Sequence, residues 1–321
     1  MRSVTADSGC DQLRHPGLMT HSTLAQCSHS LYHYTDIHGL FGILDNQELW
    51  ATDLRFLNDL SEQKHGEELL DRAFADCIAQ YSSESVPVDG SSDYRMVDAL
   101  KDIWSTSRQI RGDYEPTAVQ YSVTCFSEAR DQLSQWRTYA ADGYCLEFDT
   151  SDLLEHLNFV PQTGTSADHA LATDIRPVHY GDSGYEELKE LVETTARECI
   201  PLNKTEAHGS YRAGHSMSWA MRIAAHAIFL KSDAFTEERE VRALISSGRA
   251  IITPGRYGLV PRMAIPIPRN LVKAVMVGPN AYADLQEASL KTYGANHMTM
   301  NRNGTGPYRF RVERSAIPFR R

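Results

Sequence analysis

Several familiar signatures are missing from the 321-residue sequence, and each absence excludes a class of protein. It has no GxGxxG and no GxxxxGK[ST] motif, so neither a Rossmann nor a P-loop nucleotide site is indicated. No run approaches the roughly 18 apolar residues that a membrane span needs. None of the six cysteines forms a CxxC pair, and no His/Cys cluster has zinc spacing. The sequence therefore predicts free thiols in a reducing cytoplasm, no membrane contact and no bound metal.

Basic residues are also fewer than acidic residues. The chain has 32 Lys and Arg against 42 Asp and Glu, a formal net charge of -10. A generic nucleic-acid binder would more often be basic, so the charge favours a small-molecule or protein substrate. Residues 1–29 are polar and aperiodic and contain no signal-peptide core. They are expected to form a flexible leader that is dispensable for folding.

The remaining residues mix strand and helix patterns without internal repeats. Apolar and β-branched segments predict strands at 31–35, 121–127, 144–149, 240–246, 271–277 and 308–313. Helical spacing predicts helices at 37–44, 61–81, around 97–104, and at 131–140, 216–231 and 281–292. The polar region 151–215 is expected to be mostly helical and peripheral. Because strands and helices do not alternate regularly, we expect one mixed α/β domain over residues 30–321, of the α+β class, with helical insertions.

The first candidate motif is His33-Tyr34-Thr35, at the end of a predicted strand. Alternate residues of a strand share a face, so His33 and Thr35 point one way. Together they could hydrogen-bond a sugar or an amide. A buried histidine bonded to the backbone at a strand–helix junction explains the same residues.

The second motif is Asn58-Asp59, directly before a long predicted helix. Asn and Asp in this position usually serve as turn and capping residues, and Asp59 or Ser61 could be the cap. Asn58 remains a candidate for substrate binding.

The third motif follows the strand that ends at Ser127. No GxSxG elbow surrounds this serine, so it is not a lipase-type nucleophile, but it could orient a catalytic carboxylate. On the next helix Gln135 and Tyr139 are i, i+4 neighbours and share a face. Trp136 is the expected core residue, with a ligand platform as the alternative, and a buried thiol is the expected state of Cys125.

The fourth motif is Glu237-Glu238-Arg239-Glu240, which enters an apolar strand. An extended backbone would place Glu238 and Glu240 on one face, with Arg239 and Arg242 moderating their repulsion. A carboxylate held there can stabilise a developing oxocarbenium ion, as in glycosidic bond cleavage. A solvated charged loop is the alternative.

Six ordered segments give the chain a family resemblance. They are LYHYTDIHGLFGIL, LWATDLRFLNDLSE, CFSEARDQLSQWRTYA, FTEEREVRAL, the strand ending in VGP, and RSAIPFR, spanning residues 31 to 320. Together they resemble an uncharacterised bacterial family, the domain of unknown function numbered twenty-nine seventy-one. Its layout is distantly similar to the ADP-ribosyltransferase superfamily. That resemblance implies a split sheet and cleavage of the nicotinamide–ribose bond of NAD.

The resemblance assigns a role to each candidate residue. His33 would bind NAD, Ser127 would hold the Glu240 carboxylate, and Glu240 would stabilise the transition state. Glu238 would orient or deprotonate an acceptor, which could be a protein or a nucleic acid. The other implied NAD contacts are Thr35, Asn58, Trp136, Arg137, Tyr139 and Arg242, with Arg137 or Arg242 on the pyrophosphate and Tyr139 on nicotinamide. A first-strand His with a Ser and a Glu-x-Glu belongs to neither standard triad of that superfamily.

Two functional hypotheses follow. The first is an NAD-dependent ADP-ribosyltransferase or NAD glycohydrolase, of the kind used as toxin, effector or phage-defence factor, with an antitoxin or regulatory partner. The second is a non-enzymatic nucleotide- or protein-binding module on the same fold. An open cleft lined by His33, Ser127 and Glu240 would favour the first. Burial of Glu240 in an ion pair with Arg242 or Arg137 would favour the second. Glu240→Gln is expected to leave folding almost unchanged.

Overall fold

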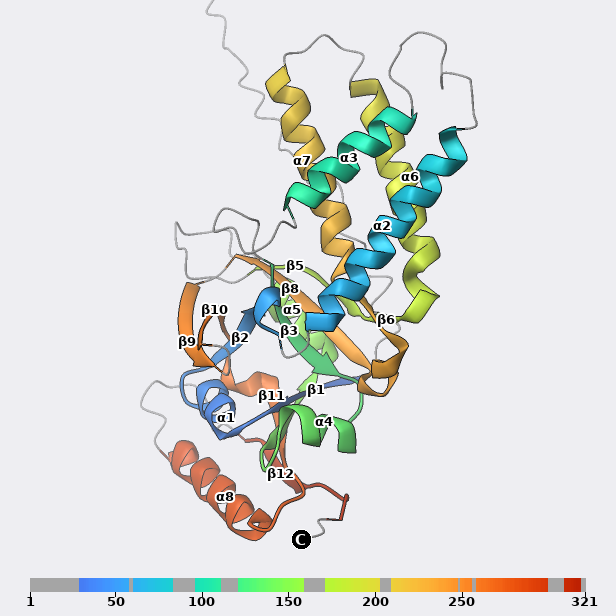
Figure 1. The fold of residues 1–321 in the computed structure, drawn as a ribbon. Helices are drawn as coiled ribbons and strands as arrows, with labels where there is room; N and C mark the ends of the chain where they lie inside the picture. The colour runs from blue at the N-terminus through green and yellow to red at the C-terminus, as the bar shows by residue number, and fades with distance from the viewer. Residues whose placement is uncertain are drawn as a thin grey trace, which may run out of the picture.

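The computed structural model has a mixed α/β fold, built on a ten-stranded mixed sheet with helices around it (Figure 1). It describes residues 29–57, 60–82, 96–110, 121–158, 171–202, 209–247, 249–255, 258–299 and 309–318. Nearly all of the leader predicted at residues 1–29 lies outside these ranges, and so does Asn58. The extent of a single domain over residues 30–321 stays a prediction.

The elements agree with most of the sequence pattern. The strands are β1 (Ser30–Thr35), β2 (Glu48–Asp53), β3 (Ser122–Ser127), β4 (Tyr144–Asp149), β5 (Leu171–Pro177), β6 (His179–Tyr180), β7 (Leu230–Lys231), β8 (Glu240–Ser247), β9 (Arg249–Gly255), β10 (Gly258–Pro266), β11 (Val272–Val277) and β12 (Arg311–Arg314). The α-helices are α1 (Ile37–Leu44), α2 (Leu60–Ser82), α3 (Met96–Ile110), α4 (Leu133–Tyr139), α5 (Thr150–Asn158), α6 (Tyr185–Leu202), α7 (Gly209–Ala227) and α8 (Ala283–Thr299). Short 3-10 turns lie at Leu54–Phe56, Gly181–Gly184, Asp233–Glu238 and Arg269–Leu271.

Strand β3 is the point at which the sheet divides. Along one edge it pairs with β8 over its whole length, from Ser122 to Ser127. Its other edge is shared: Ser127 pairs with β1, whereas Ser122 and Val123 pair with β2. The branch β1–β4–β11–β12 and the branch β2–β10–β9 therefore diverge from the same edge of β3.

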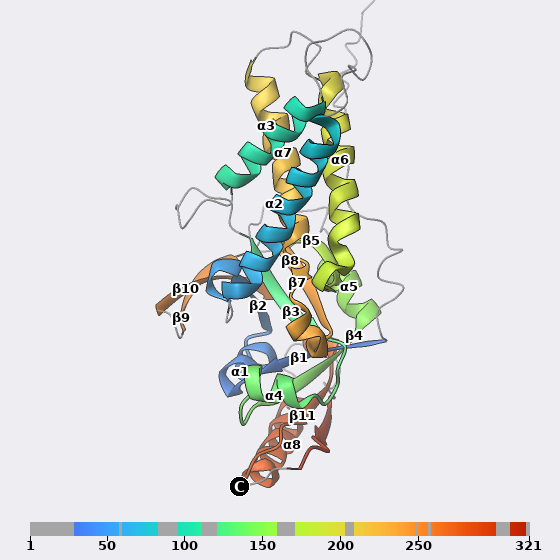
Figure 2. The ribbon, with the colours of Figure 1, turned by 45° about the vertical axis from the view of Figure 1, so that its right-hand side comes forward.

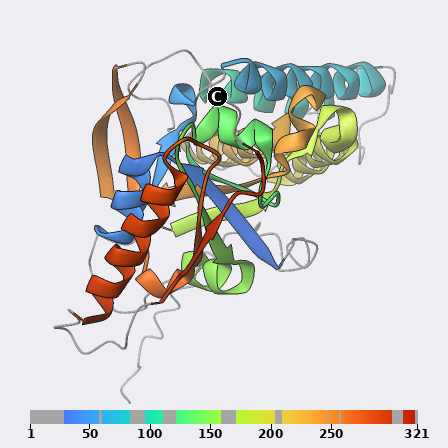
Figure 3. The same ribbon diagram turned by 90° about the horizontal axis from the view of Figure 1, so that it is seen from below.

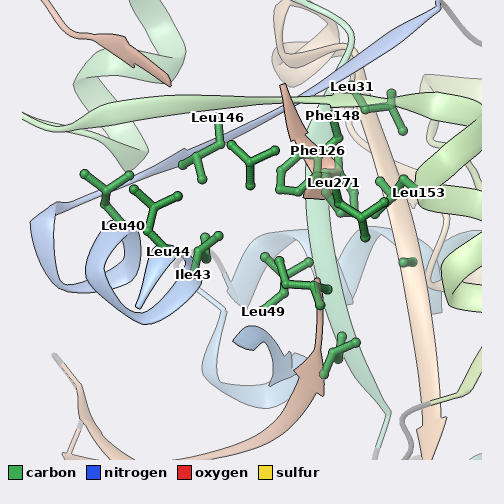
Figure 4. Packing of buried hydrophobic residues seen from close by; sticks show 14 of the residues in the cluster. Leu31, Leu40, Ile43, Leu44, Leu49, Phe126, Leu146, Phe148, Leu153 and Leu271 are labelled. Atoms are coloured by element: carbon green, nitrogen blue, oxygen red, sulfur yellow. The ribbon is translucent and has the colours of Figure 1, made fainter. Parts of the chain in front are cut away.

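Helix α1 connects β1 to β2 across this division. Asp36 caps its N-terminus by accepting a hydrogen bond from the Gly39 amide at 2.8 Å. Leu40, Ile43 and Leu44 recur at helical spacing and face the main hydrophobic cluster (Figure 4). The cluster also contains Leu146 and Phe148 of β4, so one core joins α1 to both branches of the sheet.

A second hydrophobic cluster lies among the helices α2, α3, α6 and α7, which extend away from the sheet (Figures 1 and 2). The prediction of a peripheral region at 151–215 was wrong for α6, which lies within it. Leu188, Val192, Ala196 and Cys199 give α6 one fully buried stripe within an otherwise charged sequence. The high charge of the exposed face hides this stripe in the average composition.

Other differences concern strands that composition did not reveal. β5 pairs with β8 inside the region expected to be helical, and β2, β9 and β10 form a complete branch. In β2 the buried residues alternate, but they are Leu49, Ala51 and an aspartate, Asp53, and the apolar Trp50 lies between the first two, so hydrophobicity does not reveal the alternation. At the other end of the sheet, α8 packs beside β11 and β12 (Figure 3).

Candidate functional site

A pocket of about 250 Å³ lies where the two branches leave β3. The end of β1, the first turn of α1, strands β2 and β3, helix α4, residues 238–242 and β10 all contribute to its lining. His33, Ser127 and Glu240 are all among the lining residues, as the sequence predicts. Strands β1, β3 and β8, which carry them, belong to one connected sheet.

The register between β3 and β8 brings the polar residues together. Ser127 lies directly opposite Glu240, and Cys125 lies opposite Arg242. The alternate residues of β8, Val241, Ala243 and Ile245, enter the main hydrophobic cluster. Because side chains alternate along a strand, burying the apolar set in the core directs the acidic and basic set to the pocket side.

Glu240 is buried and held between two cations. Its carboxylate accepts hydrogen bonds from Arg242 Nε at 2.8 Å and Arg242 Nη2 at 3.0 Å, and from Lys231 Nζ at 3.0 Å. Only 6% of the residue is exposed. Burial alone would raise the pKa of this carboxyl group, but Arg242 and Lys231 lower it to about 2. Glu240 is therefore ionised, and its charge is matched inside the protein.

Glu238 shares one of these cations. Lys231 Nζ lies 2.6 Å from its Oε2, and the Tyr139 hydroxyl lies 3.2 Å from Oε1. Lys231 is itself only 1% exposed and lies over the Phe235 ring. One buried ammonium group thus bridges two carboxylates from the same short segment.

The backbone between the two glutamates is turned rather than extended. Glu238 ends a 3-10 turn, Arg239 adopts a left-handed conformation with φ of 45°, and Glu240 begins β8. The expectation of an extended Glu238–Glu240 segment was therefore wrong. Both carboxylates nevertheless reach Lys231, while Arg239 is exposed and pairs with Glu128 at 3.6 Å. Left-handed residues other than glycine are uncommon and persist where the surroundings hold them.

Ser127 holds this turn. Its hydroxyl donates to the Glu238 carbonyl at 2.6 Å and accepts the Ala129 amide at 2.9 Å. The Gln135 side-chain amide lies 3.4 Å from the same carbonyl. The prediction that Ser127 binds the Glu240 carboxylate was wrong, because its hydroxyl is committed to the backbone of Glu238.

His33 makes the backbone contact that the alternative interpretation of its motif required, and it also lines the pocket. Its Nδ1 lies 2.9 Å from the Cys125 carbonyl. Burial lowers the pKa of the imidazole, so the ring is neutral, with the proton on Nδ1 and the lone pair on Nε2. Thr35, two residues further on, lines the same pocket. Burial also raises the pKa of the Cys125 thiol well above its usual range, in agreement with an unreactive thiol.

The structure separates the remaining candidates. Tyr139 and Arg242 line the pocket, whereas Trp136 and Arg137 do not. Trp136 is a core residue whose indole N–H donates to Asp131 at 2.7 Å, and Arg137 is exposed. The Arg242 guanidinium donates hydrogen bonds to Glu240 and to the Ile228 carbonyl, so it positions Glu240 rather than a pyrophosphate.

The lining or bridging residues that escaped the sequence analysis include Lys231, Trp50 and Arg262. Lys231 follows the apolar run Ile228-Phe229-Leu230, where a lone lysine is an available signal of a buried cation. Trp50 and Arg262 lie on β2 and β10, which were not predicted as strands. No group of three or more His, Cys, Asp or Glu that could hold a metal occurs among the described residues.

The comparisons with known proteins identify no activity. The model of the family described as protein of unknown function (DUF2971) matches residues 135–243, which run from α4 through the Glu238–Arg242 segment. This match supports an uncharacterised family for this part of the chain. The chain matches no curated protein and no solved structure. Within the described ranges, no helix combines the length and apolar character needed to cross a membrane.

Proposed function

We propose that this protein is a cytoplasmic enzyme that binds NAD in the pocket at the division of the sheet and cleaves its nicotinamide–ribose bond. The observation that carries the proposal is the convergence of His33, Tyr139, Glu238 and Glu240 on one pocket. A neutral imidazole, a phenol and two carboxylates can hydrogen-bond ribose hydroxyls and the carboxamide. Negative charge beside the ribose would stabilise the oxocarbenium-like transition state.

The two glutamates have different parts in this reaction. The Glu240 charge is matched by two hydrogen bonds from Arg242 and one from Lys231, so it is poorly placed to respond to new positive charge. We therefore assign the transition-state contact to Glu238 and a positioning role to Glu240. Glu240 fixes Lys231, which in turn fixes Glu238 at 2.6 Å. The resemblance instead implies the transition-state contact for Glu240 and the acceptor contact for Glu238.

The size of the pocket limits which part of NAD it can enclose. Pockets for drug-sized ligands span roughly 300–1,000 Å³, and this one has about 250 Å³. It would hold the nicotinamide and its ribose, while the adenosine half of NAD would extend beyond it. The divergence of two strand branches from β3 is the feature that supports a split sheet of the ADP-ribosyltransferase kind. The acceptor would be water, a protein or a nucleic acid, and an antitoxin or regulatory partner would fit a toxin or phage-defence role.

A specific observation favours a second function, a binding module without catalysis. Glu238, Glu240, Lys231 and Arg242 carry two negative and two positive charges, so the cluster is balanced without a ligand. Holding the turn at Arg239 in place is a sufficient role for such a buried network, without any catalysis. In that case the pocket would bind a nucleotide or a protein segment without reaction.

Nicotinamide release distinguishes the two functions. Purified protein is incubated with NAD, and free nicotinamide is followed by chromatography. Wild type should release it, and Glu238→Gln should be slower by about a hundredfold to a thousandfold, since one preorganised electrostatic contact is lost. Glu237→Gln, which changes the exposed neighbour in the same turn, should match wild type.

The controls separate chemistry from folding. Each variant is first shown to have the wild-type circular dichroism spectrum and to bind NAD with similar affinity. No release by wild type with water, protein or nucleic acid as acceptor would leave the binding module as the function. Unchanged release in a folded Glu238→Gln protein would exclude Glu238 as the catalytic carboxylate.

A further inference from the structure

Arg262 is a cation in the pocket that no carboxylate pairs with in the described part of the chain. It lies on β10, and its Nε donates to Thr253 Oγ1 at 2.8 Å while Nη1 donates to Thr52 Oγ1. Burial lowers the pKa of this guanidinium, whereas the charge of Asp36 opposes the shift from a distance. Glu48, the carboxylate of β2 that also lines the pocket, pairs instead with Arg249. Arg262 is partly buried, and a partly desolvated charge that is hydrogen-bonded only to hydroxyls gains from a counter-charge.

Two further donors lie on the same face of the β2–β10 pair. Thr52 is directly opposite Arg262, and Trp50 is directly opposite Ala264, so both point to the pocket side with Arg262. The Trp50 indole N–H is buried without a hydrogen-bond partner, and its ring centroid lies 5.6 Å from Arg262 Cζ. Because Thr52 Oγ1 accepts from Arg262, its own O–H remains able to donate to a ligand.

The first turn of α1 adds to this donor set. His38 and Gly39 line the same pocket, at the end of the helix where backbone N–H groups point outward. The Asp36 cap uses only the Gly39 amide. The other backbone N–H groups of this turn therefore add hydrogen-bond donors beside Arg262. The β2–β10 side of the pocket is rich in donors. Apart from Glu48, which pairs with Arg249, the carboxylates that line the pocket are Glu238 and Glu240, from the segment that leads into β8.

We propose that Arg262, Trp50 and Thr52 bind a phosphate group of the pocket's ligand. A phosphate offers several strong acceptor oxygens and a full negative charge. These match a guanidinium that has no carboxylate partner among the described residues, an indole N–H without an acceptor and a hydroxyl that can still donate. The ligand class is thus a phosphorylated small molecule, such as a nucleotide. This inference rests on the pocket of the proposed function but not on bond cleavage, so each can fail without the other.

Calorimetry with the full chain tests phosphate recognition directly. ADP, adenosine and succinate are titrated as probes, because they separate the phosphate from the nucleoside and from a simple dicarboxylate. ADP should bind at least about tenfold more tightly than adenosine or succinate, since charge-assisted hydrogen bonds are made only to the phosphates. Its affinity should fall as salt is added.

Variants assign the recognition to named residues. Arg262→Ala should weaken ADP binding by roughly ten- to hundredfold and leave adenosine binding unchanged. Trp50→Phe removes only the N–H and should weaken ADP several-fold, which keeps the test decisive if Arg262→Ala does not fold. Arg314→Ala, which removes an exposed arginine of β12 paired with Asp284, is the control of equal charge and should bind ADP as wild type does.

Three results would overturn the inference. They are the absence of ADP binding to wild type, succinate or adenosine binding as tight as that of ADP, and wild-type ADP affinity in a folded Arg262→Ala or Trp50→Phe protein. Loss of ADP affinity in these variants supports it even if no nicotinamide is ever released. Conversely, release of nicotinamide by a protein that binds ADP no better than adenosine would leave the proposed function standing without this phosphate site.

Discussion

Arg242 holds both oxygens of Glu240, with Nε 2.8 Å from Oε1 and Nη2 3.0 Å from Oε2. Both side chains project from β8 two residues apart, and both are buried. The pair therefore fixes the direction of the carboxylate within its own strand. Lys231 then connects Glu240 to Glu238, so the arrangement of the whole cluster depends on this one contact.

Glu240→Gln should destabilise the protein, contrary to the expectation from sequence that folding would hardly change. The substitution removes the negative charge and leaves Arg242 and Lys231 buried beside a neutral amide. Breaking one side of a buried ion pair typically costs about 3–5 kcal/mol. Urea unfolding monitored by circular dichroism measures the loss, with Glu237→Gln as the exposed control. A loss below about 1 kcal/mol would show that the Glu240 charge is not needed to hold the two cations.

Acid should remove the same stabilisation in wild type. The pKa of Glu240 is lowered from 4.5 to about 2 in the folded protein. A carboxyl group whose pKa is depressed by folding stabilises the native state above its unfolded pKa, and this stability is lost as the pH falls through the folded value. The difference in unfolding free energy between wild type and Glu240→Gln should therefore shrink between about pH 4.5 and pH 2. A difference that stays constant across this window would contradict the assigned pKa.

Ser127→Ala should disturb the turn at Arg239 and lower activity through Glu238. It removes the bond to the Glu238 carbonyl and leaves the Ala129 amide without its acceptor. Loss of a buried partner typically costs about 1–3 kcal/mol. Ser134 offers a matched control in α4, because its buried hydroxyl has no hydrogen-bond partner among the described residues. Ser134→Ala should be neutral or slightly stabilising, and equal losses in the two variants would refute the role of Ser127.

His33 should stay neutral through the physiological range. Burial lowers its pKa from 6.5, and the Cys125 carbonyl selects the tautomer protonated at Nδ1. Nitrogen NMR of the labelled imidazole should show a protonated Nδ1 and an unprotonated Nε2 at pH 7. Because the unfolded chain takes up this proton more readily, the histidine should reduce stability as the pH falls below 6.5. Titration of the ring at or above pH 6.5 would contradict the burial of His33.

The sequence predicted the strands and helices whose apolar spacing is regular. The meeting of His33, Ser127 and Glu240 at one site was instead what the resemblance to the ADP-ribosyltransferase superfamily implied. The sequence could not predict the branch of β2, β9 and β10. In Glu48–Asp53 the adjacent apolar residues Leu49, Trp50 and Ala51 hide the alternation, and Gly258–Pro266 contains prolines that weaken its strand pattern. Arg262 and Trp50 were missed for that reason.

The hydrogen-bond partners within the site were also beyond the sequence. Ser127 was expected to bind the Glu240 carboxylate, yet the left-handed turn at Arg239 presents the Glu238 carbonyl to it instead. Nothing in the residue order fixes such a turn, since arginine rarely adopts this conformation. Lys231 was assigned to the end of a helix, whereas α7 ends at Ala227 and the lysine lies in β7.

Lys231→Met tests whether one ammonium group keeps both carboxylates ionised. The methionine has a similar length and remains apolar, so it can occupy the space beneath Phe235 without the charge. Glu238 and Glu240 then face each other with Arg242 as the remaining cation, and like charges in a shared site raise a carboxyl pKa. The unfolding free energy should fall by about 3–5 kcal/mol at pH 7, because a buried pair loses its partner. If Glu238 acts in the ionised form, the acidic limb of the pH profile of nicotinamide release should move to higher pH. If Lys231 is purely structural, the variant should be less stable but the acidic limb should not move. Lys273→Met, at a half-buried lysine paired with the exposed Asp152, provides the control and should change neither quantity.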